Sequence, residues 1–319
     1  MQEILEPVSR DILKRELNEE TFLRYTNFGN IEVHLVNYHR QPNTLQEIGR
    51  LRELTFRVAG GGTGLPVDID ENDTCEDAYD QLITWDPREE EIVAGYRLIR
   101  GNRVRTNSEG IHNLSTAHYF HFSEQFKRDY LPHTIELGRS FVQPKFQPGK
   151  DNRKGLFSLD NLWDGLGAIV VLNPDINYLF GKVTMYPHYH QEARDVLLYF
   201  MNHYFPDPEK LVWPIHPLGY YTDPALFKGI FDGLNYKEGY KILNARVRAL
   251  GENIPPLINT YMGLSSTMKS FGTAQNEDFG EVEETGILIT ITDIFDSKKE
   301  RHISSFERDR HYGKPREKG

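Results

Sequence analysis

The pattern of apolar and polar positions predicts strands and helices along most of the chain. Residues 30–36 (NIEVHLV) alternate in polarity as a half-buried strand does, and apolar residues then recur at helical spacing from Leu45 to Leu54, until the glycine run 60–62 ends the helix. After a polar, acidic loop, the predicted strands are 91–101, 134–143, 177–185 and 285–294. The predicted helices are 156–172, 191–205 and two or three within 223–265.

Strands interleaved with helices predict an α/β (α+β) sandwich, in which a mixed, mostly antiparallel, twisted sheet has helices on both faces. No internal repeat or linker interrupts the chain, so we expect one domain over residues 30–295, with a helical insertion at about 206–265 and a helical extension at 1–29. Residues 298–319 carry eight Lys/Arg against four Asp/Glu and almost no apolar residues. We therefore expect 296–319 to be a basic, disordered tail.

Composition narrows the possible functions. The net charge of −10 argues against nucleic-acid binding, which needs a basic surface. Cys75 is the single cysteine, which excludes an intrachain disulfide, and no constellation of ligands accompanies it, so we expect no metal. No apolar run approaches the roughly 20 residues of a membrane span, and the charged N-terminus lacks a signal-peptide core. These features predict a cytoplasmic protein, whose basic tail is either solvated or in contact with an anionic membrane.

The segment 136–142 (ELGRSFV) places a glutamate and an arginine three residues apart on a predicted strand. In a regular strand, an odd separation would point Glu136 and Arg139 to opposite faces. A bulge at Gly138 would bring both side chains to one face and splay the strand from its neighbour. The freed backbone groups would then bind an extended arm such as phosphopantetheine. The alternative is an ordinary strand with a surface ion pair.

Several charged motifs resemble those of the acyl-homoserine lactone synthases. In order and spacing, the similar motifs are Leu51-Arg52-x-x-Thr55-Phe56, Asp77-x-x-Asp80, Gly95-Tyr96-Arg97-Leu98 and Glu136-x-x-Arg139-x-x-Val142. Those enzymes have the GNAT fold, so the resemblance implies a three-layer sandwich with a splayed strand pair. It also implies one charged catalytic pocket made by Arg52, Asp77, Asp80, Arg97, Glu136 and Arg139, in which Arg52 orients the loop that carries the two aspartates. Cys75 stands where the synthases often have another acidic residue, which indicates a different acceptor.

A second set of motifs resembles a closer family, the ornithine- and glycine-lipid acyltransferases, often labelled hemolysin-like. The motifs are Leu162-Trp163-Asp164-Gly165-Leu166, Pro174-Asp175-Ile176, Leu179-Phe180-Gly181 and Pro255-Pro256-Leu257-Ile258-x-x-Tyr261. The resemblance covers residues 30–295. It implies an N-acyltransferase that moves a long-chain (3-hydroxy)acyl group from acyl carrier protein to the amine of glycine or ornithine in aminolipid synthesis.

GNAT enzymes bind the donor's pyrophosphate at a glycine-rich loop between the splayed strand and the next helix. Here Arg153, Lys154 and Gly155 stand at the predicted helix start, where anions bind readily. Leu156 follows directly, so the second glycine of the usual loop is missing. This favours the acyl-phosphopantetheine of acyl carrier protein over free coenzyme A as the donor.

The resemblance also implies roles for the pocket residues. Glu136 would be the general base, and the backbone N–H groups of Phe141 and Val142 would polarise the thioester carbonyl. Arg139 and Arg97 would hold the carboxylate of the acceptor.

Three functions compete with this one. They are an acetyl-coenzyme A-dependent N-acetyltransferase, a lactone synthase, and an inactive GNAT scaffold that serves as a lipid-associated adaptor; four charged groups in one pocket argue against the last. A basic cluster at Arg100, Arg103 and Arg105 is either a docking patch for the acidic carrier protein or a solvated hairpin tip.

Overall fold

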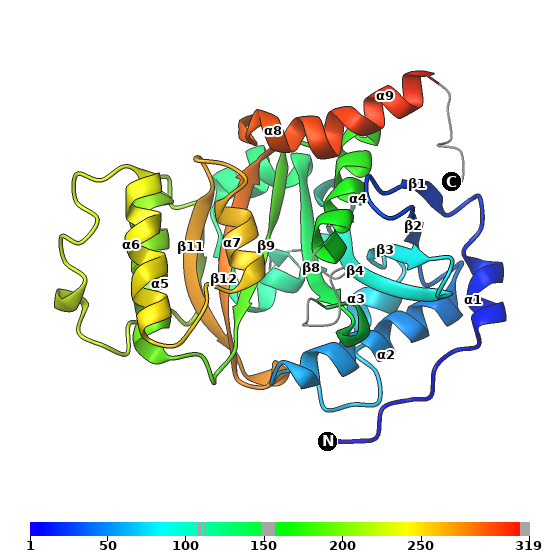
Figure 1. Ribbon diagram of the computed structural model, residues 1–319, viewed down its shortest axis with the longest axis horizontal. Coiled ribbons are helices and arrows are strands. Elements are labelled where there is room, and N and C mark those ends of the chain that lie inside the picture. Colours follow the sequence, from blue (N-terminus) through cyan, green and yellow to red (C-terminus); the bar gives the residue numbers. More distant parts are fainter. Residues whose placement is uncertain (108–109, 112, 148–156, 313–319) are drawn as a thin grey trace. The chain divides into compact units, whose positions relative to one another are not determined.

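The computed structural model describes residues 1–107, 110–111, 113–147 and 157–312, and the chain forms two compact units (Figure 1). Unit 1 comprises Met1–Ser115, His133–Asn177 and the chain from Phe295 onward. Unit 2 comprises Thr116–Pro132 and Tyr178–Ile294. Unit 1 is thus assembled from three separate segments of the chain.

Unit 1 contains an antiparallel sheet with helices on both faces. Its strands, in spatial order, are β1 (Phe22–Tyr25), β2 (Glu32–Val36), β3 (Asp80–Asp86), β4 (Glu91–Arg100) and β8 (Thr134–Val142). Leu82 of β3 points to Gly165 of α4 (Ser158–Leu172), whereas its neighbour Gln81 bonds to Arg52 of α2 (Pro42–Val58). Because successive strand residues point to opposite faces, α2 and α4 cover opposite faces of the sheet.

Unit 2 has its own antiparallel strands, in the order β9 (Tyr178–Met185), β12 (Val282–Thr290) and β11 (Lys269–Asn276). Its helices are α5 (Gln191–Tyr204), α6 (Tyr236–Ala249) and α7 (Pro256–Met262), and a small ladder joins β7 (Phe120–Phe122) to β10 (Val212–Pro214). Phe200 of α5 is fully buried among the rings of Phe205, Phe231 and Tyr236. The aromatic residues of α5 therefore build the core of this unit.

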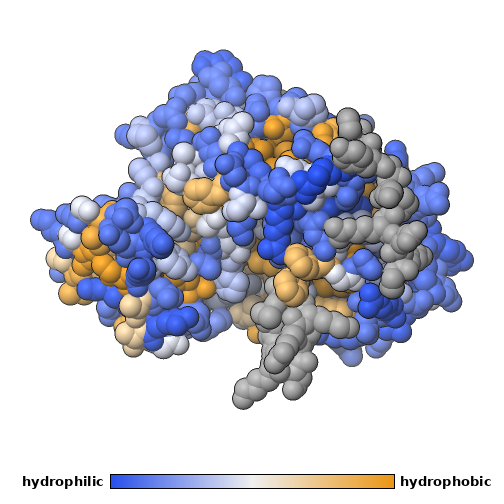
Figure 2. Space-filling view, turned by 45° about the horizontal axis from the view of Figure 1, so that its top comes forward, coloured by the Kyte–Doolittle hydropathy of each residue, from blue (hydrophilic) through white to orange (hydrophobic). Residues whose placement is uncertain are grey.

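Helix-covered antiparallel strands confirm the predicted fold class. Several strands were not predicted. β1 lies in the expected helical extension, where only α1 (Arg10–Glu16) is helical, and β3 lies in the expected polar loop. β11 and the short strands β7 and β10 were not predicted either. The splayed strand pair stays a prediction. No described helix is both long and apolar enough to cross a bilayer. The surface seen in Figure 2 is mostly hydrophilic, with hydrophobic patches set among hydrophilic regions.

The expectation of a disordered tail from residue 296 is wrong for the described residues. The chain forms α8 (Asp296–Lys299), a π-helical turn (Glu300–Ser304) and α9 (Ser305–Tyr312), and the turn and α9 pack against α4 (Figure 1). The buried His302 ring lies 2.7 Å, Nδ1 to Oδ1, from Asp164 of α4, and Phe306 is buried as well. This segment is therefore attached by a buried hydrogen bond as well as by its few buried apolar residues.

Gly167 of α4 allows the close approach of this C-terminal segment. A Cβ atom at Gly167 would lie 2.1 Å from the carbonyl oxygen of His302, well inside contact distance. We expect Gly167→Ala to lower the free energy of unfolding by about 1–3 kcal/mol or more, because backbone must move to make room. Urea titration measures this loss. Gly219→Ala is the control, since nothing lies within 4 Å of that position; equal losses in both variants would contradict the explanation.

Candidate active site

A band of buried polar side chains crosses the α2-covered face of the unit 1 sheet. Gln81 pairs with Arg97 and Arg97 with Gly138 across neighbouring strands, so their side chains share one face. Tyr79 and Glu136 lie two residues from members of this row and therefore point the same way. Arg97 and Glu136 are 2% and 1% exposed. Burying so many charged groups is costly unless each is paired, so the pairing defines the site.

The bulge predicted at Gly138 is present, one residue later. Arg97 pairs with Gly138 and Gly95 with Phe141, so Arg139 and Ser140 together oppose a single residue of β4. Arg139 takes up the distortion with φ of 49°, a left-handed conformation that non-glycine residues rarely adopt. Its guanidinium Nε then lies 2.8 Å from the Asp68 carboxylate, and Nη2 lies 3.8 Å from that of Asp70.

Two buried arginines share one aspartate at the centre of the band. Arg52 Nη1 lies 3.1 Å from Asp73 Oδ2, and Arg97 Nη1 lies 3.2 Å from the same oxygen. Arg97 also donates to both oxygens of Asp70, at 2.8 and 2.7 Å, and Gln81 bonds to both Arg52 and Asp73. Burial by itself would raise the pKa of Asp73, but the two cations outweigh it and hold the pKa below its usual value. Asp73 is therefore a fixed anion at neutral pH.

Glu136 is held by two neighbours that the sequence analysis did not single out. The Tyr79 hydroxyl donates to Glu136 Oε2, and Ser115 donates its amide to the same oxygen at 3.2 Å and its hydroxyl to Oε1 at 3.3 Å. Burial and the neighbouring Glu136 charge raise the pKa of Tyr79 well above its ordinary value, so the phenol stays neutral and remains a donor. The Arg97 guanidinium lies 5.1 Å from the centre of the Tyr79 ring and so links Glu136 to the arginine cluster.

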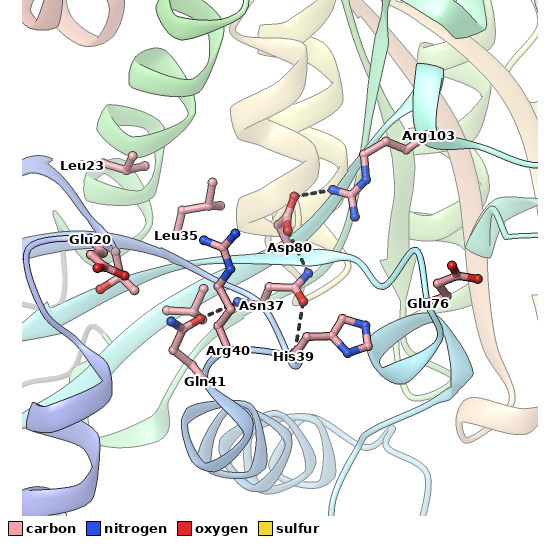
Figure 3. A pocket seen from close by; sticks show the side chains of 12 residues that line it. Glu20, Leu23, Leu35, Asn37, His39, Arg40, Gln41, Glu76, Asp80 and Arg103 are labelled. Atoms are coloured by element: carbon pink, nitrogen blue, oxygen red, sulfur yellow. Dashed lines mark hydrogen bonds and ion pairs between the residues drawn. The ribbon is translucent and has the colours of Figure 1, made fainter.

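Asp77 and Asp80, two of the predicted pocket residues, lie outside this band. Asp80 pairs with Arg103 at 2.6 Å and accepts from Asn37 at 2.9 Å, at the edge of a polar surface pocket of about 510 Å³ (Figure 3). Asp77 pairs with the exposed Arg105. The prediction that Arg52 faces these two aspartates is therefore wrong.

The aspartates that do face the arginines are Asp70 and Asp73, which have the same spacing and lie earlier in the chain. Asp70 caps the short helix α3 (Glu71–Thr74), and its carboxylate accepts from the amide of Asp73, whose own carboxylate accepts from the amide of Asp70. This reciprocal capping box fixes both carboxylates beneath the sheet. Asp-Glu-Asn-Asp at 70–73 reads as such a box in the sequence, which is the signal that could have identified it.

The residues expected to contact the donor are only partly described. Arg153, Lys154 and Gly155 lie outside the described residues. At the end of β8, Gln143 donates its amide to the Val93 carbonyl at 3.0 Å. Because successive strand residues direct their amides to opposite edges, the Phe141 amide faces β4 and the Val142 amide faces away. Of the two, Val142 is the one directed away from the ladder with β4.

The basic cluster at Arg100, Arg103 and Arg105 does not form a free cationic patch. Each guanidinium pairs with a carboxylate, on Asp175, Asp80 and both Glu76 and Asp77 respectively. This neutralisation disfavours the cluster as a docking patch for an acidic protein.

Comparison with known proteins assigns the chain to a family. An acetyltransferase (GNAT) domain model matches residues 51–153, a stretch that contains Arg52, Asp73, Arg97, Glu136 and Arg139. Proteins named glycine N(alpha)-acyltransferase from Phocaeicola vulgatus and Bacteroides thetaiotaomicron are each 53% identical to this chain over 306 residues, which is 96% of the chain and 94% and 91% of those proteins. The chain belongs to the glycine N(alpha)-acyltransferase family. The predicted family, GNAT fold and acyltransferase class are thereby confirmed.

Solved structures similar to this acyltransferase include acyl-homoserine lactone synthases. The coenzyme A-dependent synthase BjaI with SAM and isopentyl-CoA has 11% identity and a TM-score of 0.38, covering 89% of this chain and 90% of that one. The synthase LasI has 14% identity and a TM-score of 0.30, covering 48% of this chain and 72% of that one.

Proposed function

We propose that this acyltransferase moves a long-chain 3-hydroxyacyl group from acyl carrier protein to the amine of glycine, and so makes an N-acyl amino acid for aminolipid synthesis in the cytoplasm. The observation that carries the acceptor is the 53% identity, over 96% of the chain, to proteins named for glycine. Glycine is therefore preferred to ornithine, which the sequence resemblance allows equally.

The reaction requires a base, because the amine of a free amino acid is mostly protonated at pH 7 and only the neutral amine attacks a thioester. We assign this role to Glu136, acting directly or through one water. Glu136 first takes the extra proton of the ammonium group and passes it to solvent. The neutral amine nitrogen then bonds to the thioester carbonyl carbon, the carbon–sulfur bond breaks, and the second proton lost by nitrogen passes by way of Glu136 to the departing thiolate. The bonds from Tyr79 and Ser115 support this role because they fix the orientation of the carboxylate.

The acceptor's carboxylate is best assigned to Arg139. Arg97 is 2% exposed and surrounded by Asp70 and Asp73, whereas the Arg139 side chain is 15% exposed. Asp70, whose side chain is 33% exposed, lies 3.8 Å from Arg139. Together they offer one anion and one cation at the accessible edge of the band, which suits a zwitterionic amino acid with no side chain to accommodate. The Val142 amide would polarise the thioester carbonyl.

Purified enzyme with defined donors and acceptors tests the proposal. Incubation with 3-hydroxyacyl carrier protein and glycine should release the carrier thiol and yield N-(3-hydroxyacyl)glycine by mass spectrometry, with ornithine a poorer acceptor. Acyl-coenzyme A and acetyl-coenzyme A are run in parallel. Turnover with acetyl-coenzyme A alone would overturn the donor assignment, and acylated ornithine as the main product would overturn the acceptor.

A further inference from the structure

Helix α6 of unit 2 presents a row of cations to solvent. Its buried residues are Gly239, Leu243 and Val247, on the side that packs beside α5 (Figure 1). Lys237, Lys241 and Arg248 are all exposed. At about 100° per residue these three fall within roughly 40° of arc, so they form one stripe along the helix, here called the α6 stripe.

The α6 stripe lacks counter-charges. Three other cations of unit 2 are paired, Lys182 with Glu284, Arg194 with Glu283 and Lys269 with Glu209. Within the described part of the chain, no carboxylate lies at ion-pair distance from Lys237, Lys241 or Arg248. The one acid on α6, Glu238, accepts from the Asn235 amide at 3.1 Å as half of a capping box.

The composition of this surface indicates a protein partner rather than a membrane. A helix that lies on a bilayer inserts large apolar side chains beside its cations. The large apolar residues of α6 instead face α5 or are partly covered, and none of the strongly exposed ones of the described chain belongs to α6. A charged stripe without apolar anchors suits electrostatic docking of a soluble, acidic partner, and it stands out on a chain of net charge −10.

We propose that the α6 stripe docks the acidic acyl carrier protein that delivers the donor, an inference that rests on the proposed donor. The cations steer the carrier toward the enzyme and hold its acidic surface, so their contribution falls as salt screens them. This surface replaces the cluster at Arg100, Arg103 and Arg105, whose charges are neutralised within the chain.

Kinetics with two donors test the docking surface. We compare the wild type with the triple variant Lys237→Glu, Lys241→Glu, Arg248→Glu, using acyl carrier protein and the matching acyl-pantetheine. The ratio of kcat/KM for the protein donor to that for the small donor should fall by at least about tenfold. The control Arg15→Glu, Arg88→Glu, Lys298→Glu changes the net charge equally in unit 1 and should keep the ratio within about twofold of the wild type, since rim charges away from a docking surface contribute little to association.

The outcomes separate the two proposals. A wild type that uses acyl-coenzyme A but not acyl carrier protein overturns the donor assignment. If the enzyme uses acyl carrier protein but the ratio of kcat/KM values is the same in both triple variants, the α6 stripe is not the docking surface, and the donor assignment is unaffected. The same conclusion follows if the stripe variant keeps the wild-type ratio and loses only its sedimentation with anionic vesicles. Should the stripe variant fail to fold, the wild type decides: its KM for acyl carrier protein must rise with ionic strength while that for acyl-pantetheine does not.

Discussion

Glu136→Gln is expected to lower kcat by about 10²–10⁴-fold while the protein remains folded. The amide has nearly the shape of the carboxylate and can still accept from Tyr79 and Ser115 through its oxygen, but it cannot take the proton from the attacking amine. Steady-state kinetics with saturating donor and glycine measure the loss. Circular dichroism and urea titration of the same preparation verify that the fold is intact.

Glu283→Gln is the matched control for Glu136. Glu283 is also a mostly buried glutamate, and it accepts from the Tyr221 hydroxyl at 2.8 Å and from Arg194 at 2.6 Å. We expect its variant to lose stability rather than turnover. If Glu136→Gln kept near-normal kcat while folded, or if the two variants lost kcat equally, the assignment of Glu136 as the base would be wrong.

Asp73→Asn should lower the free energy of unfolding by about 3–5 kcal/mol, the cost of leaving buried charges without their partner. Arg52 and Arg97 both contact this carboxylate, and neither side chain is more than 2% exposed. Urea titration at pH 7 measures the loss. Asp80→Asn, which removes a partly exposed partner from Arg103, should cost about 1 kcal/mol or less. Similar losses in the two variants would show that the buried cluster around Asp73 contributes no more to stability than the partly exposed Asp80–Arg103 pair.

The pH dependence of this difference follows from the lowered pKa of Asp73. A carboxyl group whose pKa is lower in the folded than in the unfolded state stabilises the fold fully above the unfolded pKa, about 3.9, and loses that contribution as pH falls through the folded pKa. The gap in stability between wild type and Asp73→Asn should therefore be constant between pH 7 and about 5, and should narrow below about pH 4. A gap that widened in acid would contradict the assignment.

Much of the fold could be predicted because its elements have clear periodicity. The strand predicted at 134–143 is β8 (Thr134–Val142), and the helix predicted at 191–205 is α5 (Gln191–Tyr204). β3 was not predicted because it follows an acidic loop and is buried on both faces, so its residues do not alternate between apolar and polar. The C-terminal helices were not predicted because the segment has too few apolar residues to indicate a packed helix. The structure attaches it through a polar contact, the hydrogen bond between His302 and Asp164.

The candidate site could be predicted where the local sequence allowed one conformation, and not where two aspartate pairs had the same spacing. Glycine at 138 beside two charges indicated a bulge, and the structure has it at Arg139. The Asp-x-x-Asp spacing occurs at 70–73 as well as at 77–80. The resemblance to the lactone synthases directed the assignment to 77–80, although only 70–73 forms the capping box that holds its carboxylates beside the arginines. Tyr79, which precedes β3, was missed because a tyrosine next to a strand usually packs in the core; only its contact with Glu136 reveals another role.

Because unit 1 is assembled from three separate segments of the chain, its folding during synthesis must follow a certain order. Unit 2 is drawn almost entirely from one stretch, 178–294, and is synthesised before residues 302–306 leave the ribosome. Asp164 and Gly167 cannot make their contacts until His302 has been synthesised, about 135 positions further along the chain. Contacts so distant in sequence form slowly. Unit 1, which carries the candidate site, therefore completes its packing only after the C-terminal helices have been translated, whereas unit 2 is free to fold on the nascent chain.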